Sequence, residues 1–138
     1  MGIQDELKLI EIKEFANSIP GYNFVIDDRN LATSIFINDA GEVLKHTGTT
    51  NQYDYQSLKN SGWHHFVPDI IDYDKKVIIE YQESAKRLRK HTVKGHDELS
   101  DADKDLYYEL AGFRQIKIWD YDTEWKETLR EELLQIEV

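Results

Sequence analysis

The segment VPDIIDYDKKVIIEYQES, residues 67–84, decides the fold predicted for this chain. Two runs rich in β-branched and aromatic residues, HHFVPDII (64–71) and KVIIEYQ (76–82), flank the turn-forming sequence DYDK. This arrangement predicts a β-hairpin. The hairpin would carry two acids, Asp69 and Glu80, within largely apolar strands, where folding alone does not favour a charge.

The register of this hairpin decides whether the two acids meet. If Asp74-Lys75 forms a two-residue turn, the numbers of paired residues sum to 149, and Asp69 lies directly opposite Glu80. Their Cβ atoms would then be about 5 Å apart on one face of the sheet. A slip of one residue would place them on opposite faces. Glu80 and Gln82 share a face in either register, because side chains alternate along a strand.

The remainder of the chain predicts helices and strands around this hairpin. Periodicity and end signals indicate three helices, and short β-branched runs indicate three further strands. The expected helices span residues 5–17, 99–113 and 122–136, the expected strands span 23–26, 34–38 and 113–121, and the polar segment 45–62 is expected to be a long loop with at most one helical turn. We therefore predict an α/β domain with a mixed sheet flanked by helices.

Length and composition limit the class of protein. The chain has 138 residues, which suits one domain, and its 40% apolar and 12% aromatic residues indicate a folded globule. The absence of cysteine excludes a disulfide framework and thiolate chemistry. The N-terminus has no secretory pattern and no run reaches transmembrane length. We therefore expect a soluble cytoplasmic protein without a membrane partner.

The net charge of −10 is unevenly distributed. The segment KRLRKHTVKGH (86–96) contains no acid, and the rest of the chain stands at −15. An acidic protein is repelled by nucleic acid at long range, whereas a local basic loop can neutralise DNA phosphates. A solvated charged loop is the ordinary alternative. The candidate DNA-binding residues of this segment are Lys86, Arg87, Arg89, Lys90, Lys94 and His96.

The two hairpin acids suit a divalent cation. Two carboxylates held within a few ångströms raise at least one pKa unless a cation neutralises them. Mg²⁺ or Mn²⁺ prefers oxygen ligands, commonly one or two carboxylates completed by phosphate oxygens. Such an ion polarises a phosphoryl group and lowers the pKa of an attacking water. The alternative is a surface hairpin whose acids only solvate its outer face.

The chain has a PD pair followed, after ten residues, by E-x-Q. This pattern resembles the motif of the PD-(D/E)XK nuclease superfamily, some members of which have glutamine in place of the motif lysine. DADKDLYYELAGFRQIKIWDYDTEW (101–125) is similar to a helix–strand segment of very-short-patch-repair-like and phage homing-type endonucleases, and ELKLIEIKEF (6–15) resembles their opening helix. The resemblance covers residues 5–17 and 64–135. It implies a single domain with a restriction-endonuclease-like core, in which residues 31–62 are an insertion.

The resemblance also implies roles for individual acids. Asp69 and Glu80 would hold the metal ion. The opening helix of the family carries a glutamate at the active site, for which Glu11 is the best match and Glu14 the next. Glu11 would assist the metal ligands or orient the attacking water.

Gln82 departs from the usual family pattern. It carries no charge to stabilise the attacking hydroxide or the phosphorane-like transition state, which affects the expected rate more than the fold. The resemblance places a basic residue, Lys104, on the helix facing the site, where it would supply the missing charge. The alternative is a solvated lysine paired with Asp101 or Glu109 on its own helix.

Histidines and aromatic residues near these positions have simpler interpretations. His64 and His65 precede the PD pair; one could face the site, although such a histidine is more often a partly buried hydrogen-bonding residue. His96 is a candidate general acid or base, because imidazole titrates near neutrality. The four aromatic residues of the later helices and strand are interpreted as core: Tyr107, Tyr108, Trp119 and Trp125.

These observations predict a metal-dependent DNA endonuclease that hydrolyses a phosphodiester by in-line attack of water. A domain of this size often forms a homodimer to cut both strands, although no segment stands out as a dedicated interface. Two alternatives stay open. One is an inactive nuclease-fold module that binds DNA or a protein, which Gln82 and the net charge favour. The other is an acidic nucleic-acid mimic.

Overall fold

A computed structural model describes residues 3–26, 33–45, 52–84 and 101–136 of the chain. Its centre is a four-stranded sheet in the order β1-β5-β6-β7. These strands are β1 (Val25–Ile26), β5 (Ile70–Asp72), β6 (Val77–Gln82) and β7 (Arg114–Trp119). β5 is antiparallel to β1 and β6, whereas β6 and β7 are parallel, so the sheet is mixed as predicted.

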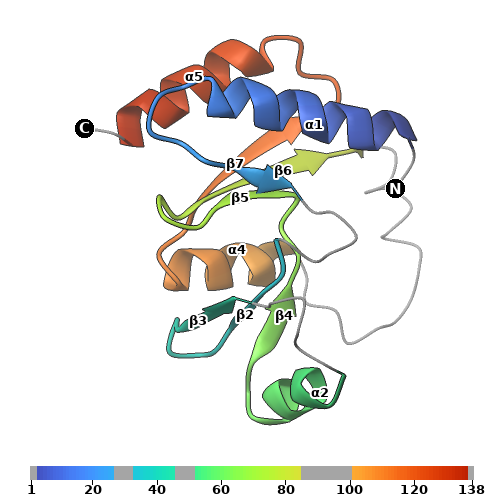
Figure 1. Cartoon of the computed structure of the whole chain (residues 1–138), viewed down its shortest axis with the longest axis vertical. Coiled ribbons are helices and arrows are strands. Elements are labelled where there is room, and N and C mark those ends of the chain that lie inside the picture. The colour runs from blue at the N-terminus through green and yellow to red at the C-terminus, as the bar shows by residue number, and fades with distance from the viewer. Residues whose placement is uncertain (1–2, 27–32, 46–51, 85–100, 137–138) are drawn as a thin grey trace.

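Helices cover both faces of this sheet (Figure 1). α1 (Ile3–Asn17) and α5 (Trp125–Ile136) lie side by side on one face, and α4 (Asp101–Leu110) lies on the other. The α/β class with a mixed sheet flanked by helices is therefore confirmed. Within the described part of the chain, no helix combines the length and the apolar character needed to cross a membrane.

The predicted register of the central hairpin is confirmed. β5 and β6 pair Ile70 with Ile79, Ile71 with Ile78 and Asp72 with Val77, and each pair of numbers sums to 149. The ladder ends at Asp72–Val77, so the connection comprises residues 73–76 rather than two residues alone. Its last residue, Lys76, has a positive φ of 55°.

A second, three-stranded sheet lies beyond α4, and the sequence did not predict it. Its order is β3-β2-β4, formed by β3 (Val43–Lys45), β2 (Ile35–Ile37) and β4 (His64–Phe66). The prediction of one strand over 64–71 is wrong, because the chain leaves this sheet at Val67-Pro68 before entering the central one. Proline has no N–H for a strand ladder and restricts the residue before it, which suits such a break.

The prediction of a loop over 45–62 is also wrong. Residues Gln52–Asn60 form helix α2, which ends beside β4 (Figure 1). The segment is strongly polar overall, which favoured a loop over a packed helix in the sequence.

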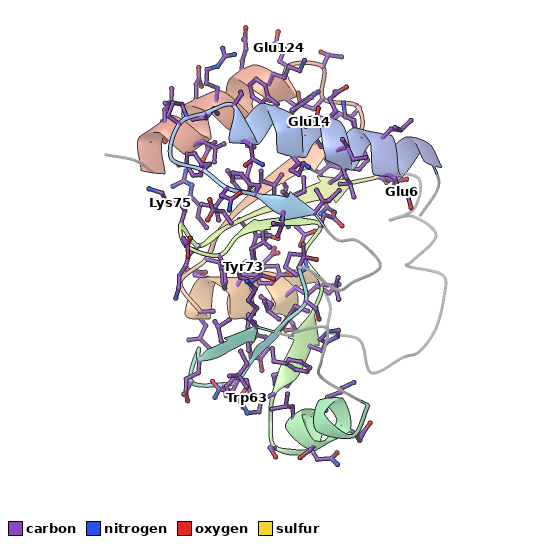
Figure 2. All side chains as sticks on the ribbon, in the orientation of Figure 1. Glu6, Glu14, Trp63, Tyr73, Lys75 and Glu124 are labelled. Carbon is purple, nitrogen blue, oxygen red and sulfur yellow. The ribbon has the colours of Figure 1, made fainter. Side chains whose placement is uncertain are left out.

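Side-chain alternation along the hairpin divides the core into two clusters. Ile70 and Ile79 pack toward α1 and α5, with Ile12 and Leu129 among the fully buried residues of that cluster. The next residues along each strand, Ile71 and Ile78, pack toward α4 and the second sheet. Side chains fill the space between the central sheet and the helices on both sides (Figure 2). By the same alternation, the residues flanking Ile70 and Ile79 face α4.

Two glycines have conformations that a side chain would strain. Gly112 ends α4 with a φ of 86°, as its position predicted. Gly41, in the turn between β2 and β3, has a φ of 80°, and a Cβ atom built on it would lie 2.5 Å from the main-chain oxygen of Leu110. The turn of the small sheet therefore packs its backbone directly against the end of α4.

We expect Asp72 to be important for the stability of the hairpin. Its buried carboxylate accepts the N–H of Asn23 at 2.8 Å and the N–H of Lys75 at 3.0 Å. Asp72→Ala should lower the free energy of unfolding by about 2–4 kcal/mol, because two backbone donors lose their acceptor. Asp74→Ala, at an exposed position of the same turn, should change it by less than about 0.5 kcal/mol. Urea denaturation measures both, and equal losses would contradict this role.

Candidate functional site

The hairpin brings Asp69 and Glu80 together on the face of the sheet covered by α4. Each carboxylate accepts a hydrogen bond from the opposite strand. The N–H of Tyr81 donates to Oδ2 of Asp69 at 2.9 Å, and the N–H of Asp69 approaches Oε2 of Glu80 at 3.4 Å. These bonds continue the strand pairing beyond Ile70–Ile79 and fix both acids in position.

The environment of Glu80 opposes its ionisation. Burial raises the pKa of Glu80 well above its ordinary value, and the adjacent Asp69 carboxylate raises that pKa further through its negative charge and a shared side-chain hydrogen bond. The N–H of Asp69 and the positive charge of Lys104 act in the opposite direction. The two acids therefore favour a shared proton or a cation over two unscreened negative charges.

Helix α4 supplies two residues to this pair. Tyr108 is buried, and its hydroxyl donates to Oε1 of Glu80 at 3.3 Å. Burial and the nearby Glu80 carboxylate raise the pKa of Tyr108, so its hydroxyl stays a donor. Lys104 lies one helical turn earlier and on the same side of α4, half-buried and close enough for its charge to act on Glu80. Among the described side chains, it forms no ion pair with Glu109; the side chain of Asp101 lies outside the described ones.

The side chain of Gln82 lies on the same face as Glu80. It is half-buried near the end of β6, where Gln82 pairs with Trp119 of β7 and its main-chain oxygen accepts the N–H of Asp120 at 2.9 Å. Lys117 lies beside Glu80 on β7, but its Nζ is held by Asp105 at 2.9 Å. Neither Lys117 nor Tyr108 was expected from the sequence to lie beside the acids.

The structure does not bring Glu11 to this group. Glu11 is exposed on α1, where its Oε1 pairs with Nζ of Lys8 at 3.4 Å. The neighbouring residue, Ile12, is fully buried toward the sheet, so Glu11 points well away from it. Glu14 is exposed as well. Moreover, α1 covers the face of the central sheet opposite to α4 (Figure 1).

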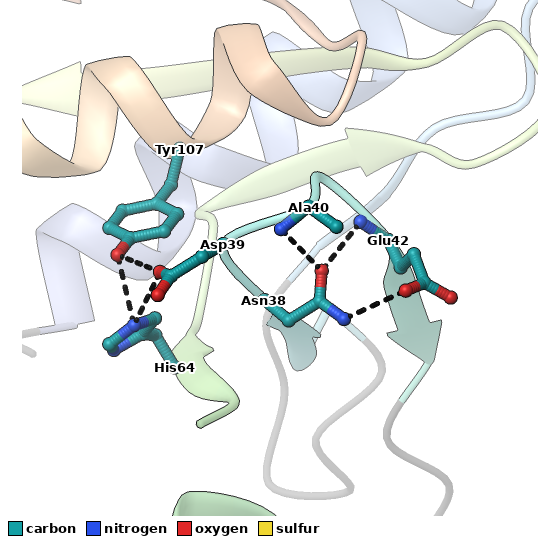
Figure 3. Close-up of polar contacts among 6 residues, drawn as sticks. All are labelled: Asn38, Asp39, Ala40, Glu42, His64 and Tyr107. Atoms are coloured by element: carbon teal, nitrogen blue, oxygen red, sulfur yellow. Dashed lines mark hydrogen bonds and ion pairs between the residues drawn. The ribbon is translucent and has the colours of Figure 1, made fainter. Parts of the chain in front are cut away.

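The two histidines before the PD pair have structural partners. Nε2 of His64 lies 2.9 Å from the Tyr107 hydroxyl and 3.3 Å from Oδ1 of Asp39, and the Tyr107 hydroxyl donates to the same oxygen at 2.6 Å (Figure 3). His65 bonds through Nε2 to Ser34. The interpretation of such histidines as hydrogen-bonding residues therefore fits their contacts.

This Asp39–His64–Tyr107 cluster is a polar group that the sequence did not predict. The hydrogen bond from Tyr107, and to a smaller extent that from His64, lowers the pKa of Asp39. The Tyr107–Asp39 bond also raises the pKa of Tyr107. The cluster joins the turn after β2 and strand β4 to helix α4 (Figure 3). Only the three-dimensional contact of segments far apart in the chain creates it, so no local signal could have identified it.

The interpretation of all four aromatic residues as core is correct only in part. Tyr108 and Trp125 are buried, whereas Tyr107 is half-buried in the polar cluster. Trp119 is half-buried and stacks on the exposed Tyr121, with ring centroids 5.6 Å apart. The predicted DNA-binding residues of 86–96 lie outside the described residues.

The donors of the acid pair suit a hard divalent cation. Across residues 3–26, 33–45, 52–84 and 101–136, no three histidine, aspartate or glutamate side chains gather in a group that could hold a metal ion. Two carboxylates completed by water or phosphate oxygens are nevertheless a common arrangement for Mg²⁺. Asp69 and Glu80 could therefore serve as the protein ligands of such an ion.

No family model, curated protein or solved structure matches this chain. What the molecule does must therefore be argued from the geometry of the acid pair and its neighbours.

We expect Glu80→Gln to stabilise the protein without divalent ions at pH 8 by about 1–3 kcal/mol, because it removes a charge held away from water. The pKa of Glu80 is raised in the folded state, so the wild-type free energy of unfolding should fall as the pH rises from about 4.5 through that raised value. Below pH 4.5 the two proteins should be equally stable. Urea denaturation across pH tests this, with the exposed Glu131→Gln as the control that should show no comparable gain.

The charge of Lys104 should act through Glu80. Lys104→Met should lower the free energy of unfolding at pH 8 by about 0.5–1 kcal/mol when Glu80 is present. It should have almost no effect in the Glu80→Gln background, because the interacting charge is gone. A double-mutant cycle measured by urea denaturation decides this. Equal losses in both backgrounds would mean that Lys104 acts elsewhere.

Proposed function

We propose that this protein is a metal-dependent DNA endonuclease of the PD-(D/E)XK type. The observation that carries the proposal is the convergence of Asp69 and Glu80, from opposite strands, beneath the positive charge of Lys104. Two adjacent carboxylates repel each other when both are ionised, which destabilises the folded protein when no cation is bound. A divalent cation between them offsets this repulsion. The resemblance of the PD and E-x-Q pattern to this superfamily supports the same reading.

The residues divide the chemistry among them. Asp69 and Glu80 would hold Mg²⁺ or Mn²⁺, which polarises the phosphoryl group and lowers the pKa of the attacking water. Lys104 offsets negative charge that develops on the phosphate. Tyr108 keeps Glu80 in one orientation through its hydroxyl, and the Gln82 amide is suited to hydrogen-bond the water or a phosphate oxygen. Glu11 has no part in this scheme because of its exposed position on α1.

A restriction-endonuclease-like core with an insertion is the finer fold that accompanies this proposal. The mixed central sheet between α1 and α4 supports it, with Asp69 immediately before β5 and Glu80 on β6, the two middle strands. Within the expected insertion, 31–62, the described elements are α2 and two strands of the additional sheet, β2 and β3. The basic segment 86–96 begins four residues after Gln82, the last residue of β6, which supports its assignment as the contact to DNA phosphates.

An inactive nuclease-fold module that binds DNA or a protein is the second candidate. Gln82 favours it, because an amide cannot supply the charge of the lysine that the motif usually contains. An acidic nucleic-acid mimic is less well supported, since mimicry requires acids spread over an exposed surface. Here the two central acids face a tyrosine and a lysine of α4.

The test is cleavage of supercoiled plasmid in Mg²⁺ or Mn²⁺. The wild type should nick or linearise the plasmid, and Asp69→Asn and Glu80→Gln should each reduce the rate by at least about 100-fold, because each removes a metal ligand. Glu109→Gln, an exposed acid on α4, is the matched control and should retain activity.

Thermal unfolding provides a second readout that does not depend on turnover. Mg²⁺ or Mn²⁺ should raise the Tm of the wild type but not that of Glu80→Gln, because a ligand that binds the folded state stabilises it. A metal-induced shift without cleavage would favour the inactive module. The absence of both the Tm shift and the cleavage would overturn the metal site itself.

A further inference from the structure

We propose that Trp119 and Tyr121 form a stacking platform for an unpaired base of the substrate strand, so that the preferred substrates are DNAs with single-stranded or unstacked nucleotides. This inference rests on the proposed function, whose substrate class it specifies. The two rings stack with centroids 5.6 Å apart and planes 21° apart. Tyr121 is 68% exposed, which leaves much of its ring available to a ligand.

The platform lies on the face of the sheet that carries the acids. Trp119 pairs with Gln82 in the parallel register of β6 and β7, and paired residues of neighbouring strands point to the same side. The preceding residue, Ile118, points to the other face of the sheet, into the core cluster beneath α1 and α5. Trp119 is therefore one strand across and two residues along from Glu80, a separation of about 8 Å between their backbone positions. This is comparable to the reach of a nucleotide from its phosphate to its base.

The platform is held on both sides by hydrogen bonds. The carboxylate of Asp120, between the two rings in sequence, accepts the N–H of Ser84 at 3.1 Å and its hydroxyl at 3.2 Å. Asp122 accepts the N–H of Glu124 at 3.0 Å where α5 begins. The rings are thus fixed between the end of β6 and the start of α5, so little ordering is needed when a base stacks on them.

The charge around the rings favours a base over a phosphate as the contacting group. Asp120 and Asp122 flank Tyr121 directly in sequence, and acids repel the DNA backbone. A base presents an uncharged π-face, and stacking on an aromatic side chain tolerates any base. In a continuous duplex the bases are stacked on one another and cannot reach the ring. An unpaired strand or a flap offers the required face.

The experiment measures the affinity for a hairpin DNA with a single-stranded flap and for a blunt duplex by fluorescence anisotropy, with Ca²⁺ replacing Mg²⁺. An abasic site is moved along the flap one nucleotide at a time. Tyr121→Ala should weaken flap binding about 5- to 100-fold and duplex binding less than about twofold. Tyr121→Phe keeps the ring and should bind like the wild type. The slope of affinity against salt should stay unchanged, since no phosphate contact is lost.

A coupled loss identifies the stacked base. At one flap position, an abasic site should weaken DNA binding by the wild type as much as Tyr121→Ala weakens binding to the intact flap. The abasic site and Tyr121→Ala together should reduce the affinity no more than either change alone. Additive losses at every position, equal losses on flap and duplex, or no DNA binding would each overturn the platform.

The two proposals fail in different ways. Asp69→Asn should abolish cleavage but leave the coupling between Tyr121 and the abasic position intact. Coupling without cleavage by the wild type would support the platform and reject the endonuclease. Cleavage without coupling would overturn the platform and leave the endonuclease standing.

Discussion

The antiparallel register of β5 and β6 is the constraint on which the rest of the structure depends. It directs Ile70 and Ile79 to the cluster beneath α1 and α5, and it directs Ile71 and Ile78 to the cluster beneath α4. The same alternation sets Asp69 and Glu80 on the α4 side. A shift of one residue in β6 alone would exchange its two faces, so four fully buried isoleucines hold the acids in place. Apolar packing thus determines where an unfavourable electrostatic contact occurs.

Much of the fold was predictable because its signals are local. The hairpin register follows from alternation on both sides of a short turn. α4 and α5 have periodic apolar positions, and α1 has recognisable end signals. The second sheet was not predictable for a physical reason. Its strands are three residues long, and β2 pairs with β4 across nearly thirty residues of chain. Such short segments gain their stability from tertiary pairing, so their own sequences carry little information.

The candidate site also contains some features that the sequence could predict and others that it could not. The pairing of Asp69 with Glu80 and the approach of Lys104 could be anticipated from the register and the resemblance. Tyr108 could not, because a tyrosine in the apolar stripe of a helix gives no sign that its hydroxyl meets an acid 28 residues earlier. The position of Glu11, apart from the two acids, has a different cause. The rotational phase of α1 is set by Leu9, Ile12 and Ala16, and that phase turns Glu11 to solvent.

The close approach of Gly41 to Leu110 has a consequence for how this protein could diverge in sequence. Besides the Asp39–Tyr107 hydrogen bond, the turn between β2 and β3 meets α4 through the main chain of Gly41, and that approach does not depend on a side chain at position 41. The exposed positions of β3, Leu44 and Lys45, could therefore vary more freely than the three buried residues of β2. At position 41 itself, the left-handed conformation and the 2.5 Å approach leave room for glycine alone. Among distant relatives we would expect an invariant glycine between an apolar β2 and a more variable β3.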